Sequence, residues 1–166
     1  DMAPQVLKGR LALVTGAGQG NGRAIARGLA QAGARVVVTD LNGDNAAKVR
    51  DEIRVAGGEA WAFQHDVADH AASLLVAEQV GREAGAIDIL VNNAGIIIRE
   101  GVDSPRAVAN FERMLDVNVM GSFIPTQAWL PALRATRGCV INVASIAGSA
   151  GLAGTRFQLL PSEGSY

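Results

Sequence analysis

The chain has 166 residues, of which 49% are hydrophobic and 19% charged, and its formal net charge is −1 at pH 7. Hydrophobicity this high with so little net charge excludes a largely disordered chain. Charges of both signs are interleaved without a basic block, so neither a nucleic acid nor an anionic membrane is expected as a partner.

The N-terminal segment 1–8 has no apolar signal core, and no apolar run approaches the length needed to span a bilayer. A cytoplasmic protein with a small-molecule ligand is therefore expected. Cys139 is the only cysteine and lies inside the apolar run 138–143, where we expect a small buried core residue.

Short apolar runs alternate with longer amphipathic segments along the chain. The short runs predict five strands, at 11–14, 35–39, 61–64, 87–91 and 140–143. The longer segments predict helices that begin near Gly22, Asn45, Asp69 and Pro105, with Ser104 as the N-cap of the last. This alternation predicts an α/β fold, a doubly wound parallel sheet with helices on both faces and strand order 3-2-1-4-5.

A glycine-rich turn, TGAGQGNG at 15–22, follows the first predicted strand and leads into a helical run. Glycine permits close approach of a diphosphate, and the helix N-terminus supplies partial positive charge. Gly16, Gly20 and Gly22, with Gln19 and Asn21 between them, are the predicted phosphate-binding residues. The spacing differs from G-x-G-x-x-G, so the turn alone fits a structural turn as well as a nucleotide site.

Asp40 ends the second predicted strand, about 20 residues beyond the glycine turn, where a carboxylate can accept hydrogen bonds from both ribose hydroxyls of adenosine. It would repel a 2′-phosphate, and segment 15–22 contains no lysine or arginine to offset that repulsion. Asp40 therefore favours NAD as cofactor. The alternative interpretation is an aspartate that only caps a helix.

Polar residues also follow the third and fourth strands, as Asp66-Val67 and as Asn92-Asn93-Ala94-Gly95. Together with the glycine turn, Asp40, Asn118 and the stretch 141–148 (INVASIAG), these motifs resemble the short-chain dehydrogenase/reductase family over about residues 8–154. The resemblance implies a Rossmann-type domain at 1–154 that lacks the usual C-terminal strands.

The resemblance also implies roles for individual residues. Asp66 and Val67 would flank the adenine, and Asn92 with the following turn of Asn93, Ala94 and Gly95 would shape the cofactor wall. Asn118 would support the proton relay, and Ser145 would hydrogen-bond the substrate oxygen. Independently of the family, a hydroxyl after a central parallel strand points toward the ligand crevice, although such serines also cap turns.

No metal site is predicted. His65 and His70 flank a strand end and a helix start, and neither has a cysteine or histidine partner at ligand spacing. We expect structural or solvated histidines at both positions.

The resemblance stops after Gly154 or Thr155. Family members have a catalytic tyrosine shortly after the serine and a lysine one helical turn later, but Gln158 stands where that tyrosine is expected. Tyr166 is the only tyrosine, and Lys8 and Lys48 are the only lysines, so no Tyr-x-x-x-Lys is present. We interpret 155–166 as a tail foreign to the family, produced by a frameshift or by truncation.

Loss of the following segment has structural consequences. We expect the fifth strand to be an unpaired edge, and the helix from about Pro105 to Arg134, interrupted around Gly121 and Pro125, to expose an apolar stripe. Self-association into a homo-oligomer is the predicted result.

Three functional hypotheses follow. By family resemblance the chain derives from an NAD(H)-dependent oxidoreductase that transfers hydride between NAD and an alcohol or carbonyl substrate, and it is expected to be inactive without the tyrosine and lysine. Alternatively it is a catalytically silent NAD-binding or interaction module, or a scaffold that neither binds nor catalyses.

Overall fold

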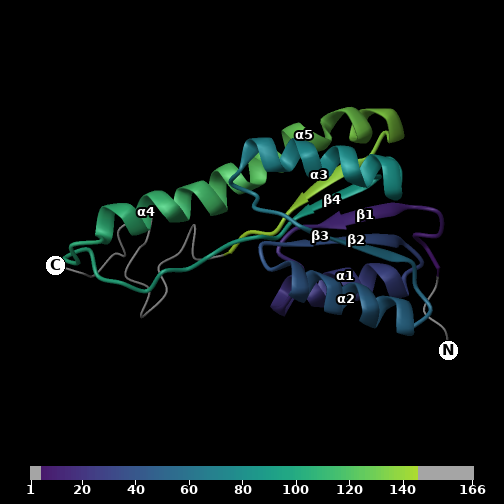
Figure 1. The fold of residues 1–166 in the computed structure, drawn as a ribbon, viewed down its shortest axis with the longest axis horizontal. Coiled ribbons are helices and arrows are strands. Elements are labelled where there is room, and N and C mark those ends of the chain that lie inside the picture. Colours follow the sequence, from purple (N-terminus) through teal and green to yellow (C-terminus); the bar gives the residue numbers. More distant parts are fainter. Residues whose placement is uncertain (1–4, 146–166) are drawn as a thin grey trace.

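A computed structural model describes residues 5–145, which form a five-stranded parallel sheet between two layers of helices (Figure 1). The strands are β1 (Leu11–Val14), β2 (Arg35–Asp40), β3 (Ala60–Gln64), β4 (Ile89–Asn92) and β5 (Cys139–Asn142). Their spatial order is β3-β2-β1-β4-β5, and each neighbouring pair is parallel. The predicted fold class and strand order are confirmed.

The helices are α1 (Gly20–Gln31), α2 (Gly43–Val55), α3 (His70–Glu83), α4 (Ala107–Leu115) and α5 (Gly121–Thr136), and a π-helical turn, η1 (Asp116–Met120), joins the last two. Helices α1 and α2 cover one face of the sheet, and α3 and α5 cover the other (Figure 1). Helix α4 continues the line of α5 beyond the edge where the strands end.

The alternation of side chains along the strands creates two cores. Ala12 and Val14 of β1 pack against α1 and α2, together with the small residues of those helices. Leu11 and Leu13 face the other way, into a core with larger side chains that includes Trp129 of α5. Both faces of the central strand are therefore buried, as expected for a doubly wound sheet.

Two of the predicted helix starts have capping side chains. The Asn42 side chain accepts a hydrogen bond from the Asn45 amide at 3.1 Å, and Asp69 accepts one from the Ala72 amide at 2.9 Å. Each satisfies an amide that the first turn of a helix leaves without an intrahelical partner.

The predicted start of the fourth helix at Pro105 was wrong, because α4 begins at Ala107. The Ser104 hydroxyl accepts a hydrogen bond from the Arg106 amide, and its carbonyl accepts one from Ala107. These contacts form a separate turn before the helix. Ser104 is therefore not the N-cap of α4.

The predicted interruption near Gly121 corresponds to the π-helical turn, but Pro125 does not interrupt α5. Pro125 is the fifth residue of that helix, so its missing N–H removes at most the hydrogen bond to the Gly121 carbonyl. A π-helical turn inside an α-helix is frequently associated with a functional site.

Strand β5 is an edge of the sheet formed by the described residues, as predicted. The expectation that Cys139 is a buried core residue was wrong, since this side chain is exposed. No described element covers the outer side of β5, and Ile141 in the same strand is 47% exposed. The predicted apolar stripe is also present, with Phe123 of α5 65% exposed.

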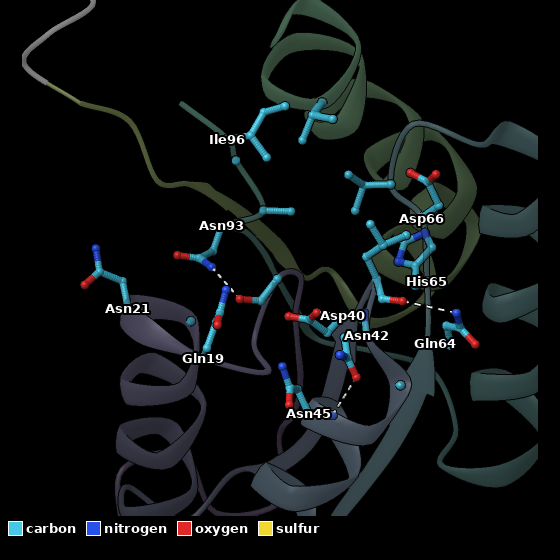
Figure 2. Close-up of a pocket in the computed structure, with 18 of the residues that line it drawn as sticks. Gln19, Asn21, Asp40, Asn42, Asn45, Gln64, His65, Asp66, Asn93 and Ile96 are labelled. Carbon is cyan, nitrogen blue, oxygen red and sulfur yellow. Dashed lines mark hydrogen bonds between the residues drawn. The ribbon is translucent and has the colours of Figure 1, made fainter. Parts of the chain in front are cut away.

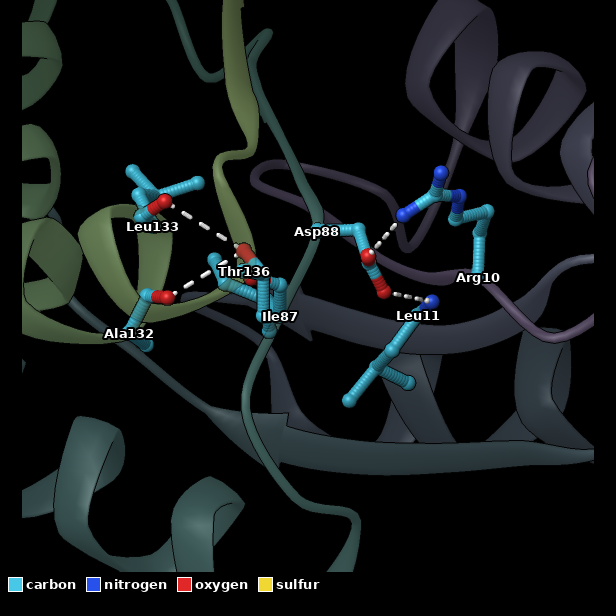
Figure 3. A network of polar contacts seen from close by, with 7 residues as sticks. All are labelled: Arg10, Leu11, Ile87, Asp88, Ala132, Leu133 and Thr136. Atoms are coloured by element: carbon cyan, nitrogen blue, oxygen red, sulfur yellow. Dashed lines mark hydrogen bonds and ion pairs between the residues drawn. The ribbon is translucent and has the colours of Figure 1, made fainter.

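Figure 3 shows the polar contacts that fix the strand starts. The Asp88 carboxylate accepts hydrogen bonds from the Leu11 amide at 2.8 Å and from Arg10 Nη1 at 2.7 Å. Nearby, the Thr136 hydroxyl donates to the Ile87 carbonyl at 2.9 Å. The end of α5 and the starts of β1 and β4 are thus held together. The opposite ends of the strands, their carboxyl ends, remain available for a ligand.

The proposed domain end at 154 and the tail 155–166 lie outside the described residues. Within 5–145, no helix combines the length and apolar character required to cross a membrane.

Candidate functional site

A cavity of about 900 Å³ lies at the carboxyl ends of β1 to β4 (Figure 2). Its walls come from the segments that follow these strands and from the helix beyond them. The lining consists of Gly16, Gln19, Asn21, Gly22, residues 40–45, 64–67 and 93–96, Arg113 and Val117. Its volume is within the range of roughly 300–1,000 Å³ that is common for small-molecule sites.

The glycine turn requires two of its glycines for close packing on the segment after β4. Gly16 has φ +60°, and a Cβ there would lie 2.7 Å from Ala94 Cα. A Cβ at Gly22 would lie 2.5 Å from Asn93 Nδ2 and would also collide with the Gly16 carbonyl. The turn can therefore lie against the segment after β4 only with glycine at both positions.

Helix α1 begins at Gly20 directly behind this turn. Its N-cap residue, Gln19, makes no capping hydrogen bond with its side chain, and its first turn contains no acidic residue. The first amides of the helix are therefore available to a ligand, and the helix dipole favours an anion there.

Thr15 and Asn93 fasten the glycine turn to the loop after β4. The Thr15 hydroxyl accepts hydrogen bonds from the Asn93 and Ala94 amides, both at 3.1 Å. In return, Asn93 Nδ2 donates to the Thr15 carbonyl at 3.0 Å and to the Gly16 carbonyl at 3.1 Å. The two walls of the cavity are thus held at a fixed separation.

Asp40 lies at the end of β2 and lines the cavity. Its Oδ2 accepts a hydrogen bond from the Gly18 amide at 2.8 Å, and its Oδ1 accepts one from the Asn42 amide at 2.9 Å. An ionised carboxylate has about four acceptor positions, so both oxygens retain capacity for a ligand hydroxyl. The same side chain therefore shapes the glycine turn and can accept hydrogen bonds from a ribose.

His65 supports the turn after β3 from inside the protein. Its Nε2 lies 2.8 Å from the Ser73 hydroxyl, its Nδ1 lies 3.4 Å from the Thr39 hydroxyl, and its ring packs edge-on against Trp129. Burial lowers the pKa of His65 to about 4, although Asp66 and Asp69 oppose the shift. The imidazole is consequently neutral near pH 7 and has a structural role.

Asp66 and Val67 follow His65 and line the cavity. Asp66 Oδ1 accepts a hydrogen bond from the Ala68 amide at 3.0 Å, and Val67 is buried. The other histidine, His70, is exposed, and its Nε2 lies 2.9 Å from Gln127 Oε1.

Asn118, in the π-helical turn, holds the loop after β4 with its side chain. Its Oδ1 accepts a hydrogen bond from the Ile96 amide at 2.8 Å, and its Nδ2 donates to the Ile96 carbonyl at 2.9 Å. Its own carbonyl accepts a 3.4 Å hydrogen bond from the Ser122 hydroxyl. In this arrangement the Asn118 side chain fixes Ile96, a residue that lines the cavity.

Most of the predicted cofactor-binding residues meet at the cavity. Those that line it are Gly16, Gln19, Asn21, Gly22, Asp40, Asp66, Val67, Ala94 and Gly95. Gly20 and Asn92 do not line it in the described part of the chain. Asn92 is buried, and its Nδ2 donates to the Ser122 carbonyl, the Thr126 hydroxyl and Asn142 Oδ1 at distances of 2.9–3.1 Å.

The two predicted catalytic residues do not line the cavity formed by the described residues. Asn118 adjoins it through Ile96. Ser145 lies three residues beyond β5 and is exposed. Gln158 and Tyr166 lie outside the described residues.

Sequence reasoning missed several lining residues. Six of them have a sequence signal, since they lie at the end of a predicted strand or in the segment that follows it; they are Leu41, Asn42, Gly43, Asp44, Asn45 and Gln64. Arg113 and Val117 have no such signal, because their helix reaches the cavity through tertiary packing. No group of three or more potential metal ligands occurs within 5–145.

A family model described as short chain dehydrogenase matches residues 10–156. The 7alpha-hydroxysteroid dehydrogenase of Escherichia coli (strain K12) is 40% identical over 135 residues, which cover 81% of this chain and 52% of that protein. Cyclohexanol dehydrogenase of Acinetobacter sp. (strain SE19) is 38% identical over 144 residues, 86% of this chain and 57% of that protein.

Solved structures give the same result. A 7alpha-hydroxysteroid dehydrogenase complexed with NADH and 7-oxo glycochenodeoxycholic acid superposes with a TM-score of 0.83 at 36% identity, covering 89% of this chain and 58% of that one. A short-chain type dehydrogenase/reductase from Mycobacterium marinum has a TM-score of 0.81 at 36% identity, with coverage of 87% and 57%. The chain thus spans about half the length of its relatives.

Proposed function

Because this chain belongs to the short-chain dehydrogenase family, we propose that it is the cofactor-binding half of an NAD(H)-dependent oxidoreductase acting on an alcohol or carbonyl compound. The observation that carries the proposal is the convergence of the glycine turn, Asp40 and the turns after β3 and β4 on one cavity of about 900 Å³. Its place beyond the carboxyl ends of parallel strands is where such sheets bind ligands.

The residues present fit a dinucleotide. The uncapped first turn of α1 and the close-packed Gly16 and Gly22 suit a diphosphate. Asp40 retains acceptor capacity for ribose hydroxyls, and Asp66 and Val67 are assigned to the adenine. When bound, the cofactor supplies or accepts the hydride.

NAD is preferred over NADP in this proposal. Three carboxylates line the cavity, those of Asp40, Asp44 and Asp66, while Arg113 is the only lysine or arginine among the described lining residues. An additional phosphate beside Asp40 would meet repulsion without a neighbouring cation. Asp40 is therefore assigned the main role in discrimination.

Two residues are assigned to the reaction centre. Asn118 supports it by fixing Ile96 and the loop after β4. Ser145 is assigned to hydrogen-bond the substrate oxygen. The cytoplasmic location expected from the sequence stays a prediction, as does assembly into a homo-oligomer.

One observation favours a second function for the chain. The sequence contains no Tyr-x-x-x-Lys, and a proton must be exchanged with the substrate oxygen when hydride is transferred. General acid–base catalysis contributes about 10²–10⁴-fold to such reactions. A catalytically silent NAD-binding module is therefore the alternative.

Titration of the 166-residue chain with NAD and NADP, by calorimetry and by thermal shift, tests the proposal. We expect NAD to bind more tightly than NADP and to raise the melting temperature. Failure of both dinucleotides to bind would refute cofactor binding. A turnover assay on a panel of secondary alcohols then separates the two functions, because reduction of NAD supports the enzyme and binding without turnover supports the silent module.

A further inference from the structure

One face of the helical segment formed by α4 and η1 lies along the wall of the cavity, and its C-terminal end contacts the turn after β3. Gly121, at the start of α5, packs against that turn, because a Cβ at Gly121 would lie 2.6 Å from Val67 Cγ2. Val117 lies four residues earlier and Arg113 four residues earlier again, and both line the cavity. Residues four apart on a helix share a face.

Two apolar side chains and one cation line the cavity on this side. Val67 comes from the turn after β3 and Val117 from the helix, so the apolar lining comes from two separate elements. Arg113 stands one turn beyond Val117, on the part of the helix that extends past the sheet in Figure 1. A flat heteroaromatic base suits these apolar side chains better than a phosphate does.

The Arg113 guanidinium has no partner among the residues that the structure describes. It forms no hydrogen bond or ion pair with another side chain or carbonyl in 5–145, although Asp40, Asp44 and Asp66 line the same cavity. By contrast, Arg106, earlier in the same region, is paired with Glu100 at 2.7 Å. A guanidinium is planar and weakly hydrated, and it stacks readily on aromatic rings.

We propose that Arg113 is a positioning residue for the cofactor, which stacks its guanidinium on the adenine base held between Val67 and Val117. The proposal rests on the proposed dinucleotide function and adds a contact outside the glycine turn and Asp40. It assigns Arg113 to the base and not to the phosphates, which belong to the N-terminus of α1 at another wall of the cavity.

The test compares adenosine, AMP, NAD and nicotinamide mononucleotide as ligands of the full 166-residue chain by calorimetry. Arg113→Met retains most of the side-chain length and removes the planar cation. We expect it to raise the Kd of adenosine, AMP and NAD by a similar factor, about two- to tenfold, as a cation–π contact predicts. The Kd of nicotinamide mononucleotide should not change.

Two further variants complete the design. Arg113→Lys keeps the positive charge but lacks the planar guanidinium group, so its affinity for the adenine compounds should lie between those of wild type and Arg113→Met. It serves as the test variant if Arg113→Met does not fold. Arg134→Met removes an exposed arginine that does not line the cavity and should leave all four Kd values unchanged.

Each other outcome overturns the inference. Unchanged affinity in Arg113→Met would show that Arg113 does not contact the nucleotide. A loss of affinity for AMP and NAD, but not for adenosine, would assign the Arg113 contact to a phosphate. If the wild-type chain binds none of the adenine compounds, the proposed function itself fails, and this result is distinct from wild-type binding that the substitution leaves intact.

Discussion

Asp40 Oδ2 accepts a hydrogen bond from the Gly18 amide at 2.8 Å, so the carboxylate at the end of β2 directly holds the glycine turn after β1. The contact is close, because a Cβ at Gly18 would lie 2.8 Å from Asp40 Cγ. One side chain thus couples the proposed ribose site to the proposed diphosphate site. A substitution at Asp40 should affect both.

Asp40→Asn tests this coupling. The amide keeps the shape but loses the charge and one acceptor, so we expect NAD to bind about tenfold more weakly, as for loss of a hydrogen bond to a charged group. NADP should lose less affinity, because repulsion of its additional phosphate is relieved. Calorimetric titration of both dinucleotides measures the two changes.

The control for Asp40→Asn is Asp103→Asn, which neutralises an exposed carboxylate that does not line the cavity. It should alter neither Kd. An equal loss of affinity for NAD and NADP in Asp40→Asn would contradict the role in discrimination.

Gly22 and Gly28 offer a matched pair within α1. A Cβ at Gly22 would press on Asn93, whereas one at Gly28 would meet nothing within 4 Å. Gly22→Ala should therefore cost about 1–3 kcal/mol in the free energy of unfolding, as overpacking does. Gly28→Ala should stabilise the protein by up to about 1 kcal/mol, because alanine is the better helix former.

Urea unfolding followed by tryptophan fluorescence measures both effects. NAD binding should be lost in Gly22→Ala and retained in Gly28→Ala. Equal free energies of unfolding for the two variants would contradict the close packing of the glycine turn on the loop after β4.

Asn118 and Ile96 give a prediction at the level of a single amide. Asn118→Leu removes the acceptor for the Ile96 N–H and the donor for its carbonyl, whereas Asn118→Asp keeps only the acceptor. Hydrogen exchange at the Ile96 amide should accelerate about three- to tenfold in the leucine variant, from the net value of one hydrogen bond. It should stay slow in the aspartate variant, and similar rates in the two variants would contradict the role of the Asn118 oxygen.

The strands and most of the cavity were predictable because their signals are local. Buried parallel strands are short apolar runs, and polar residues directly after them, such as Asp40 and Asp66, must lie at the edge where such strands end. Local rules also predicted a helix start near Asp69, and in the structure α3 begins at the next residue with Asp69 as its N-cap.

The remaining features depend on contacts between distant segments. Arg113 reaches the cavity because Gly121 packs on Val67, a contact between residues 54 positions apart that no local pattern encodes. Cys139 was misplaced because an apolar run predicts a buried strand without indicating whether any element covers it. The start of α4 was misplaced because Ser104 and Pro105, both favourable near a helix start, form the preceding turn.

The exposed apolar face predicts self-association. Phe123 of α5 is 65% exposed and Val119 of the adjoining turn is 54% exposed, and contiguous apolar patches of this kind commonly mark interfaces. We expect the sedimentation coefficient to increase with protein concentration, and Phe123→Glu to weaken this dependence. Val55→Glu, at an exposed position at the end of α2, is the control, and a wild-type chain that stays monomeric would refute the prediction.

His65 makes stability depend on pH in a defined direction. Burial lowers its pKa from 6.5 to about 4 in the folded state, so between these values the unfolded chain binds more protons than the folded one. The stabilisation is therefore complete above about pH 6.5 and is lost as the pH falls toward 4. It amounts to about 3 kcal/mol, from the free energy per unit of pKa.

Urea unfolding at pH values from 7 to 4 measures this effect in wild type, His65→Gln and His70→Gln. The carboxyl groups of Asp51, Glu52 and Glu100, whose pKa values are lowered by neighbouring arginines, lose their stabilisation in the same direction at the acid end. They are common to all three proteins, so the difference between wild type and His65→Gln isolates the imidazole. That difference should shrink as the pH falls, and the loss should persist in His70→Gln, because His70 is exposed. A difference independent of pH would mean that His65 is protonated equally in the folded and unfolded states.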